Sequence, residues 1–224
     1  MSFERLIKAN NNAFIWPLKG PYAFKNGLPI RLPSGSSTMM ELHEKIWDQI
    51  RSEGKIFGYG GYAEERDVYR NPELFKVGEK RTIHLGLDIW AKEGIPVYLP
   101  IEGIIHSFRD NDMPGNYGPT IITQHTLQGE EFYLLFGHLS RDSLNSLQPG
   151  MHVDQGAILA KLGSYEENGN WPPHLHYQII KDLGSYEGDY PGVASRSELD
   201  FYLNNCPDPM ILYNTIHHES QNSS

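Results

Sequence analysis

The stretch His84-Leu85-Gly86-Leu87-Asp88-Ile89 decides the fold prediction, because polar or small residues alternate in it with branched apolar residues. Side chains of a β-strand point alternately to opposite faces, so His84, Gly86 and Asp88 share one face and the apolar residues share the other. The same rule places the two histidines of His174-Leu175-His176 on one face of a second predicted strand. Two strands of this kind can direct imidazoles and a carboxylate toward one point.

Further short apolar runs, divided by Gly, Pro and Asn, lie around these two segments and read as additional strands. The 22 Gly and 15 Pro of the chain also favour short strands joined by turns over long helices. The sequence therefore predicts a mostly β core. Its expected strands, besides the one around residues 84–89, lie in residues 95–99, 103–105, 120–123, 132–136, 157–160 and 176–180.

One helix is predicted before this core. The segment Thr38-Met39-Met40-Glu41 has the pattern of a capping box, and apolar residues follow it at helical spacing up to Gly54. Residues 1–36 are rich in Pro, Gly and Asn and are expected to form an irregular wrapping arm. The glycine–aromatic segment 57–62 is expected to be a loop, which either lines a substrate groove or forms a plain turn packed by aromatic rings.

These patterns divide the chain into three parts. Residues 1–80 hold the arm, the helix and the Gly/Tyr loop, packed on a core of residues 81–180. Residues 181–224 form a C-terminal extension whose polar end, Gln221-Asn222-Ser223-Ser224, is expected to be frayed. A chain of 224 residues can bury a substantial core in a single catalytic domain, which is the organisation we expect.

Charge and cysteine content exclude several classes of protein. The formal net charge of -9 argues against nucleic acid or an anionic membrane surface as the main partner. The single cysteine, Cys206, excludes an intrachain disulfide and is expected to be a structural or incidental thiol in a turn. No segment approaches the ~20 apolar residues of a membrane span, and the N-terminus lacks a signal-peptide pattern. We therefore expect a soluble protein that is cytoplasmic unless it is exported by another route; the sequence predicts no oligomeric state.

Five side chains form the candidate site. Four of them lie in the two strand segments above, and the fifth is the histidine of Gly137-His138-Leu139. Zinc in hydrolytic sites takes three nitrogen or oxygen ligands from the protein and keeps a fourth position for water, so five groups leave two for acid–base work. The other histidines lack this context and are expected to be structural or solvent-exposed, namely His43, His106, His125, His152 and the His217-His218 pair.

Four motifs in this order resemble those of the lysostaphin-like (LytM-type) zinc peptidoglycan endopeptidases. They are the His84 segment, Phe136-Gly137-His138-Leu139-Ser140, residues 156–163 (Gly-Ala-Ile-Leu-Ala-Lys-Leu-Gly) and Pro173-His174-Leu175-His176-Tyr177. The resemblance spans roughly residues 57–180, and the order of four motifs is far more specific than any one of them. The arm and the helix before it match no shared motif.

The resemblance implies a fold, a metal and a reaction. It implies a barrel-sandwich hybrid core of the duplicated hybrid motif type, with one Zn²⁺ held by His84, Asp88 and His176. It implies that His138 and His174 are catalytic, without saying which of the two is the general base. The implied activity is that of a metalloendopeptidase that hydrolyses Gly- or D-Ala-containing peptides of the cell wall, with a peptide or peptidoglycan fragment as substrate.

Two other functions are compatible with parts of the pattern. One is a non-catalytic module of the same fold that binds a wall peptide or a partner, although such modules generally lose metal ligands and this chain retains all five polar positions. The other is a histidine phosphocarrier with two facing histidines on a related fold, in which Asp88 would have no purpose. Metal content separates the peptidase from both alternatives.

Overall fold

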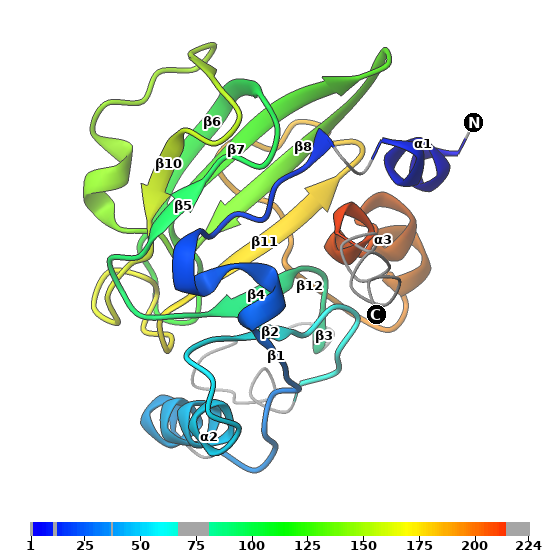
Figure 1. Cartoon of the computed structure of the whole chain (residues 1–224). Coiled ribbons are helices and arrows are strands. Elements are labelled where there is room, and N and C mark those ends of the chain that lie inside the picture. Colours follow the sequence, from blue (N-terminus) through cyan, green and yellow to red (C-terminus); the bar gives the residue numbers. More distant parts are fainter. Residues whose placement is uncertain (1, 11–12, 37, 67–80, 214–224) are drawn as a thin grey trace, which may run out of the picture.

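A computed structural model describes residues 2–10, 13–36, 38–66 and 81–213 of the chain as a mostly β structure with few helices (Figure 1). Its main sheet has eight strands in the order β1-β2-β4-β11-β8-β7-β6-β9, and neighbouring strands are antiparallel except for the β1–β2 pair. The strands of this sheet are β1 (Leu28–Pro29), β2 (Gly58–Gly60), β4 (Leu87–Trp90), β6 (Gly103–Asn111), β7 (Gly118–Leu127), β8 (Glu130–Gly137), β9 (His152–Val153) and β11 (His174–Ile180).

Two small sheets complete the β structure. One pairs β5 (Pro96–Tyr98) with β10 (Ile158–Lys161), and the other pairs β3 (Ile83–His84) with β12 (Val193–Ala194). Apart from the one around residues 84–89, the predicted strands of the core are confirmed, and several of them extend further than their apolar runs. For example, β6 and β7 continue beyond these runs and pair with each other as a hairpin. The added part contains exposed polar side chains, which an apolar run does not reveal.

The main hydrophobic core lies on one face of the large sheet. It joins alternate residues of β4 and β11, such as Ile89 and Leu175, to Val97 and Leu159 from the small β5–β10 sheet. A second cluster on the opposite face includes Leu85 and residues of the C-terminal region. Burial of both faces explains why the central strand β11 is buried along its whole length. The polar residues of β11 therefore need internal partners.

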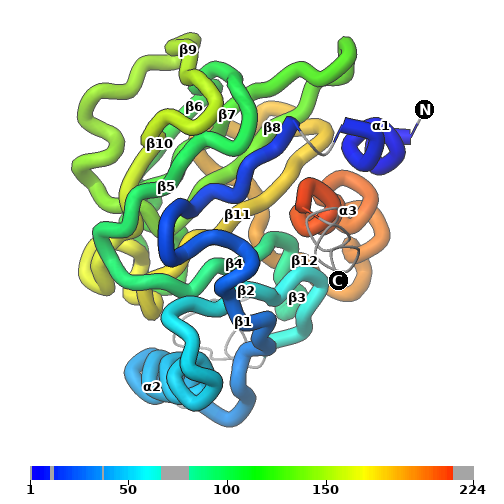
Figure 2. The backbone as a smooth tube through the Cα atoms, viewed as in Figure 1, coloured from blue at the N-terminus to red at the C-terminus, as the bar shows by residue number. Residues whose placement is uncertain are grey.

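The N-terminal arm is part of the main core. Figure 2 shows this segment in dark blue running along the β-structure near β5. Backbone hydrogen bonds fix it there, from Ile15 N to Pro100 O at 2.9 Å and from Tyr98 N to Pro17 O at 2.8 Å. Trp16 is buried in the same hydrophobic cluster as the sheet residues. These residues of the arm therefore lie against the core.

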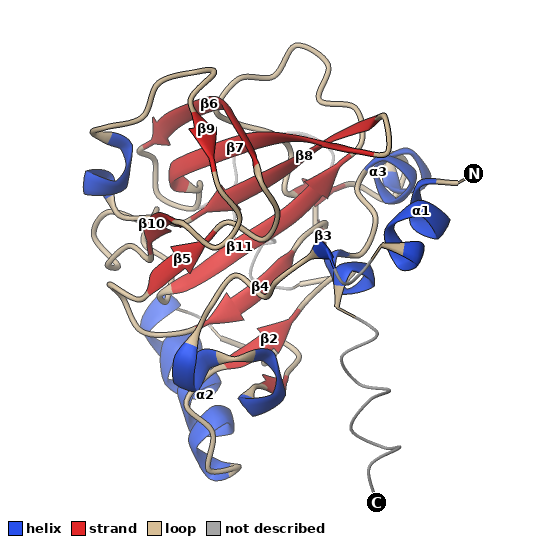
Figure 3. Cartoon of the chain, turned by 45° about the horizontal axis from the view of Figure 1, so that its top comes forward, coloured by secondary structure: helices blue, strands red, loops and turns tan. Residues whose placement is uncertain are grey.

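The predicted helix is α2 (Met39–Ser52), which lies beside the β1–β2 end of the sheet (Figure 3). Its N-terminus is capped by Thr38, whose hydroxyl accepts a hydrogen bond from Glu41 N at 3.1 Å. The buried face contains Leu42, Ile46 and Ile50, at the spacing that the sequence predicts. These residues pack in a third cluster that includes two tryptophans near the candidate site.

Two further helices correct the prediction of one helix with irregular arms. Residues 1–36 contain α1 (Phe3–Ala9), whose first turn is capped by the Ser2 hydroxyl and which buries Leu6 and Ile7. The C-terminal region contains α3 (Leu199–Asn205). Helices of seven residues are marginal in isolation, and tertiary packing therefore decides whether they form. Short 3-10 turns at Gly20–Tyr22, Phe24–Asn26, Arg141–Leu144 and Pro209–Leu212 complete the helical elements named here.

The predicted glycine–aromatic loop and the first predicted strand also differ from expectation. Residues 58–60 form β2, which pairs with β4 so that Gly60 lies opposite Asp88. The expected single strand around residues 84–89 is instead broken between β3 and β4, with a bend at Gly86. Gly58 and Gly60 leave no room for side chains, because a Cβ atom would lie 2.9 Å from Ile30 Cδ1 or 2.1 Å from Ile30 O. The arm and β2 are therefore in close contact.

Some expectations concern residues outside this description. The His217-His218 pair and the polar C-terminal end lie outside the described residues. Across the described parts of the chain, no helix has the length and apolar character that a membrane crossing requires.

Candidate functional site

The first two candidate residues lie on either side of the bend at Gly86. His84 ends β3 and Asp88 lies in β4, and both side chains are buried on the same side of the sheet. A Cβ atom at Gly86 would lie 2.5 Å from Cε1 and 2.6 Å from Nε2 of the His176 ring. Only glycine leaves the space between the two residues that this imidazole occupies.

The pairing of β11 with its neighbours brings the remaining residues into place. His176 lies opposite Asp88 on β4 and opposite Gly137 on β8, and His174 lies opposite Trp90. Both histidines therefore point to the face that carries Asp88, as the strand alternation predicts.

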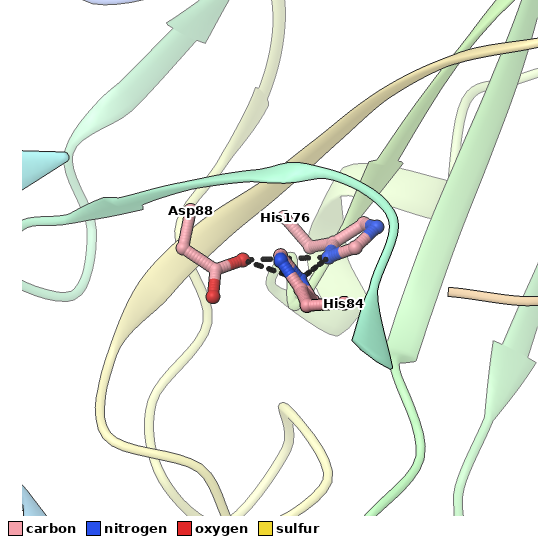
Figure 4. A group of neighbouring side chains, drawn as sticks. All are labelled: His84, Asp88 and His176. Atoms are coloured by element: carbon pink, nitrogen blue, oxygen red, sulfur yellow. Dashed lines mark hydrogen bonds and ion pairs between the residues drawn. The ribbon is translucent and has the colours of Figure 1, made fainter. Parts of the chain in front are cut away.

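His84, Asp88 and His176 form a compact cluster, in which one ligand atom of each lies within 4.8 Å of the others (Figure 4). Asp88 Oδ1 is 3.2 Å from His84 Nε2 and 3.3 Å from His176 Nδ1. The two ring nitrogens are 2.8 Å apart. The atoms thus surround a common point, and all three side chains are buried.

The outer hydrogen bonds of the two imidazoles determine which of their atoms carry protons. His84 Nδ1 donates to the carbonyl oxygen of Gly61 at 2.9 Å, because that oxygen can only accept. His176 Nε2 donates to Gln178 Oε1 at 2.9 Å, because the amide nitrogen of Gln178 is already directed at Pro191 O and Cys206 Sγ. When both rings are neutral, His84 Nε2 and His176 Nδ1 therefore carry no proton, and their lone pairs face each other.

This donor set fits a metal cation. Among the described residues, Asp88 Oδ1 is a buried polar atom without a hydrogen-bond partner, although imidazole nitrogens face it. Two facing lone pairs and an unpartnered carboxylate oxygen repel one another unless a cation lies among them. Two imidazoles and one carboxylate are a common ligand set for zinc. The three residues could therefore hold such an ion.

Charge and burial keep two of the three residues, His84 and Asp88, in their deprotonated forms. Burial, followed by the charge of Arg66, lowers the pKa of His84 to about 3. Burial would raise the pKa of Asp88, but interactions with His84 and Arg66 outweigh burial and hold this pKa well below its ordinary value. A neutral imidazole and an ionised carboxylate are the forms that bind metal.

The other two candidate residues lie next to this cluster. The rings of His138 and His174 have centroids 4.2 Å apart, and His174 Nε2 is 3.7 Å from Asp88 Oδ1. His174 also stacks on Trp90 with centroids 4.1 Å apart. The structure thus brings all five predicted side chains together, although they come from four separate segments of the fold.

Both of these histidines present the same nitrogen to the site. His138 Nδ1 donates to Asn168 O at 2.8 Å and His174 Nδ1 donates to Pro172 O at 2.7 Å, so each Nε2 carries the lone pair. Burial lowers the pKa of His174 to about 4. Burial, together with His174, holds the pKa of His138 well below its ordinary value. At neutral pH both rings can accept a proton at Nε2.

The backbone at His138 is strained. Its φ of 62° lies in the left-handed region, which for a residue other than glycine costs of order 1–3 kcal/mol. Hydrogen bonds from His138 N to Tyr117 O and from Gly163 N to His138 O hold this conformation. Strain of this kind is concentrated at functional sites, and the fixed backbone directs the ring toward His174.

Several residues that contact the cluster have little or no signal in the sequence. Arg66 donates to Asp88 Oδ2 at 2.7 Å, and the backbone oxygen of Gly61 accepts from His84. Gln178 lies two residues after His176 in the same strand, so the alternation that found the histidines could have found it too. Arg66 has no comparable pattern, because only the tertiary fold brings it to Asp88.

The histidines outside the cluster include a structural one, as expected. His125 is buried, its Nδ1 donates to Glu102 O at 2.8 Å, and its Nε2 lies 2.7 Å from Thr123 Oγ1. Burial lowers its pKa to about 4, so it is neutral. His43 and His106 are partly exposed and His152 is exposed.

The part of the chain that contains this cluster is similar to known proteins. Residues 82–187 match the model of the family described as Peptidase family M23. The L-Ala–D-Glu endopeptidase of Bacillus subtilis (strain 168) is 30% identical over 117 residues, which are 49% of this chain and 33% of that protein. The match thus spans about one third of that relative's length.

Two solved structures to which the chain is similar cover 56% and 65% of it. The catalytic domain of lysostaphin from Staphylococcus simulans has a TM-score of 0.39 and 21% identity, covering 56% of this chain and 84% of that one. The solution structure of lysostaphin has a TM-score of 0.42 and 21% identity, covering 65% and 50%. The match of residues 82–187 to peptidase family M23, which includes all five clustered residues, confirms the family resemblance that the four sequence motifs predict.

Proposed function

We propose that this protein is a zinc-dependent metalloendopeptidase that hydrolyses peptide bonds in cell-wall-type peptides. The observation that carries the proposal is Asp88 Oδ1, a buried and unpartnered carboxylate oxygen faced by the lone pairs of His84 and His176. Such an arrangement is unfavourable without a cation and favourable with one. The match to peptidase family M23 supports the same function.

His84, Asp88 and His176 would hold one zinc ion through Nε2, Oδ1 and Nδ1. When bound there, zinc supplies Lewis acidity, which polarises a substrate carbonyl and makes water a better nucleophile. The carbonyl of Gly61 and the amide of Gln178 keep the two rings in the tautomers that the ligand roles require.

His138 and His174 would move the protons of the reaction. Each has its Nδ1–H tied to a backbone carbonyl, so a proton can be accepted only at Nε2. One of these nitrogens takes a proton from the attacking water, and the resulting imidazolium returns a proton to the amine nitrogen as the C–N bond breaks. The His174 ring is held against Trp90, which leaves its Nε2 directed at the cluster.

The substrate class is a peptide with small or D-configured residues at the scissile bond, such as Gly or D-Ala. The relative from Bacillus subtilis is described as cleaving between L-Ala and D-Glu, which supports a bond of mixed chirality as a further candidate.

The organisation proposed for this enzyme keeps the three parts predicted from the sequence. Residues 81–180 form the metallopeptidase core, residues 1–80 pack on it and residues 181–224 extend it. The main sheet and the small β5–β10 sheet share one hydrophobic core, which supports the barrel-sandwich hybrid type of architecture.

Metal analysis tests this function. Untagged protein purified without added zinc should carry about one zinc per chain after dialysis, because the three donors are preorganised. Asp88→Ala should lose the metal, whereas His152→Ala is the control, because His152 is exposed and lies in the edge strand β9, which β8, β7 and β6 separate from β11. Protein that binds no zinc even when zinc is supplied contradicts the proposal.

Activity is tested on the zinc-loaded protein. Release of new amino groups from muropeptides, oligoglycine and peptides with an L-Ala–D-Glu bond should be abolished by a chelator and restored by zinc. A zinc-loaded protein that is inactive on all of these and hydrolyses another class of amide would refute the substrate class alone.

A further inference from the structure

Two of the three proposed metal ligands are held in place by residues outside the region matched by the peptidase family. The match begins at residue 82, but His84 donates to the carbonyl of Gly61 and Asp88 accepts from Arg66. We infer that residues 61–66 are an integral part of the metal centre and that Arg66 is a positioning residue for the ligand Asp88. This inference rests on the proposed zinc-dependent function.

Arg66 determines which oxygen of Asp88 faces the other ligands. Its Nη1 donates to Oδ2 at 2.7 Å, and Oδ1 is left facing the imidazole nitrogens. Both side chains are almost fully buried, with exposed fractions of 3% for Arg66 and 0% for Asp88. A charge-assisted hydrogen bond in such surroundings fixes the rotation of the carboxylate, which favours binding of the metal through one oxygen.

Arg66 is itself held by a second carboxylate. Its Nε donates to Glu64 Oε2 at 2.9 Å, and Glu64 Oε1 accepts from the backbone N–H of Leu32 at 3.0 Å. The Glu64 side chain has an exposed fraction of 11%. A continuous chain of hydrogen bonds therefore runs from the N-terminal arm through Glu64 and Arg66 to the metal ligand.

The backbone of the segment is fixed against the first ligand strand. His84 N donates to Glu64 O at 2.9 Å, Ala63 N donates to His84 O at 2.9 Å, and Arg66 N donates to Thr82 O at 2.8 Å. The segment thus forms a short ladder beside β3, and its position relative to His84 is set by the same bonds that hold the strand.

Gly61 lies in close contact with the side chains of Arg66 and His84. Its φ is 95°, and a Cβ atom there would lie 2.0 Å from Arg66 Nη2 and 3.3 Å from His84 Nδ1. The close approach lets one residue supply the carbonyl for His84 while the guanidinium passes beside it.

A purely structural ion pair is the alternative, and it makes a different prediction. A buried Arg between two carboxylates stabilises a fold mainly because removing it leaves unpaired charges. If that were its whole role, removing the charge of Glu64 together with Arg66 would recover only part of the stability lost in Arg66→Met, because Asp88 stays unpaired, and it would leave zinc affinity unchanged. A positioning role predicts that zinc affinity stays reduced even when the fold recovers.

The test compares Arg66→Met, Arg66→Lys, Glu64→Gln and the double variant Arg66→Met/Glu64→Gln in the full chain. Zinc dissociation constants are measured by chelator competition, the visible absorption of the Co²⁺-substituted protein reports ligand geometry, and thermal unfolding of the metal-free form reports the fold. Arg51→Met is the control, because Arg51 pairs with Asp48 on the exposed surface of α2.

We expect Arg66→Met and the double variant to bind zinc about 10–100-fold more weakly than the wild type and to change the Co²⁺ spectrum. Glu64→Gln should lose less, because Arg66 keeps its bond to Asp88, and Arg66→Lys should be intermediate because one ammonium cannot form both directed bonds. The control should match the wild type.

A double variant that folds, binds zinc with wild-type affinity and keeps an unchanged Co²⁺ spectrum would overturn the inference. If neither variant with Met at position 66 folds, wild-type zinc affinity in both Arg66→Lys and Glu64→Gln would overturn it equally. Failure of the wild-type protein to bind zinc is a distinct result, since it removes the proposed function itself.

Discussion

Gly86→Ala is the most direct test of how the fold builds the metal centre. The added methyl carbon would lie 2.5 Å from His176 Cε1 and 3.0 Å from Tyr177 O, where ordinary contacts begin near 3.4 Å. The ring must therefore move by roughly 1 Å to restore van der Waals contact. Metal ligands tolerate displacements of only about 0.2–0.5 Å, so the His176 nitrogen leaves its position in the cluster.

The effect on zinc should exceed the effect on folding. Overpacking of a buried site destabilises by about 1–3 kcal/mol, which for a chain of this length lowers the melting temperature of the metal-free protein by about 2–12 °C. Zinc affinity should fall at least 10–100-fold, the range seen when partners of metal ligands are lost. Chelator competition and calorimetry of the metal-free protein measure the two effects separately.

A matched control distinguishes displacement of the ligand from general crowding. Gly58→Ala in the adjacent strand β2 brings its Cβ 2.9 Å from Ile30 Cδ1, a smaller overlap that falls on an apolar side chain instead of a ligand. This variant should lose some stability and keep its zinc. If Gly86→Ala retains wild-type zinc affinity while remaining folded, the reasoning about the cluster is refuted.

Three further predictions concern groups inside and outside the site. Replacing His138 or His174 by Ala should leave zinc content unchanged and lower peptidase activity about 10²–10⁴-fold, because these rings move protons and do not hold the metal; loss of zinc from both variants in metal analysis would show that the ligand assignment is wrong. Leu175→Ala should lower the free energy of unfolding by about 2–5 kcal/mol without changing zinc content, because Leu175 is fully buried on the opposite face of β11, and denaturant titration with metal analysis measures both. Cys206 should react slowly with thiol reagents at pH 8 in the folded protein, since burial raises its pKa to about 11 and the reactive thiolate forms only as pH rises toward that value; labelling at the rate of the denatured chain would contradict its burial.

Patterns of local spacing predicted much of the fold and four of the five clustered residues, whereas His138 was identified by the motif Gly137-His138-Leu139. Strand alternation puts His174 and His176 on one face whatever the surrounding fold, and the apolar runs identify strands because burial depends on the same alternation. The cap at Thr38 and the helical spacing after it depend only on neighbouring residues. Such features are encoded within one element, so they can be read from the sequence.

Features that depend on contacts between distant segments were not predicted. Residues 58–60 were expected to be a loop because glycine is unfavourable in strands, yet Ile30 and β4 require the small residues at this edge. The bond from Arg66 to Asp88 and the carbonyl of Asn168 beside His138 depend on the completed fold. Helix α1 depends on packing because seven residues are too few to be stable alone.

The separation of the clustered residues along the chain has a consequence for folding kinetics. His84 and His176 are 92 residues apart, and they meet only when β4, which follows His84 after the bend at Gly86, pairs with β11. Contacts of such long range form late, because the entropy of closing a large loop must be overcome first. An ion that needs both residues cannot bind before that pairing is made, so zinc should leave the refolding rate nearly unchanged and slow the unfolding rate.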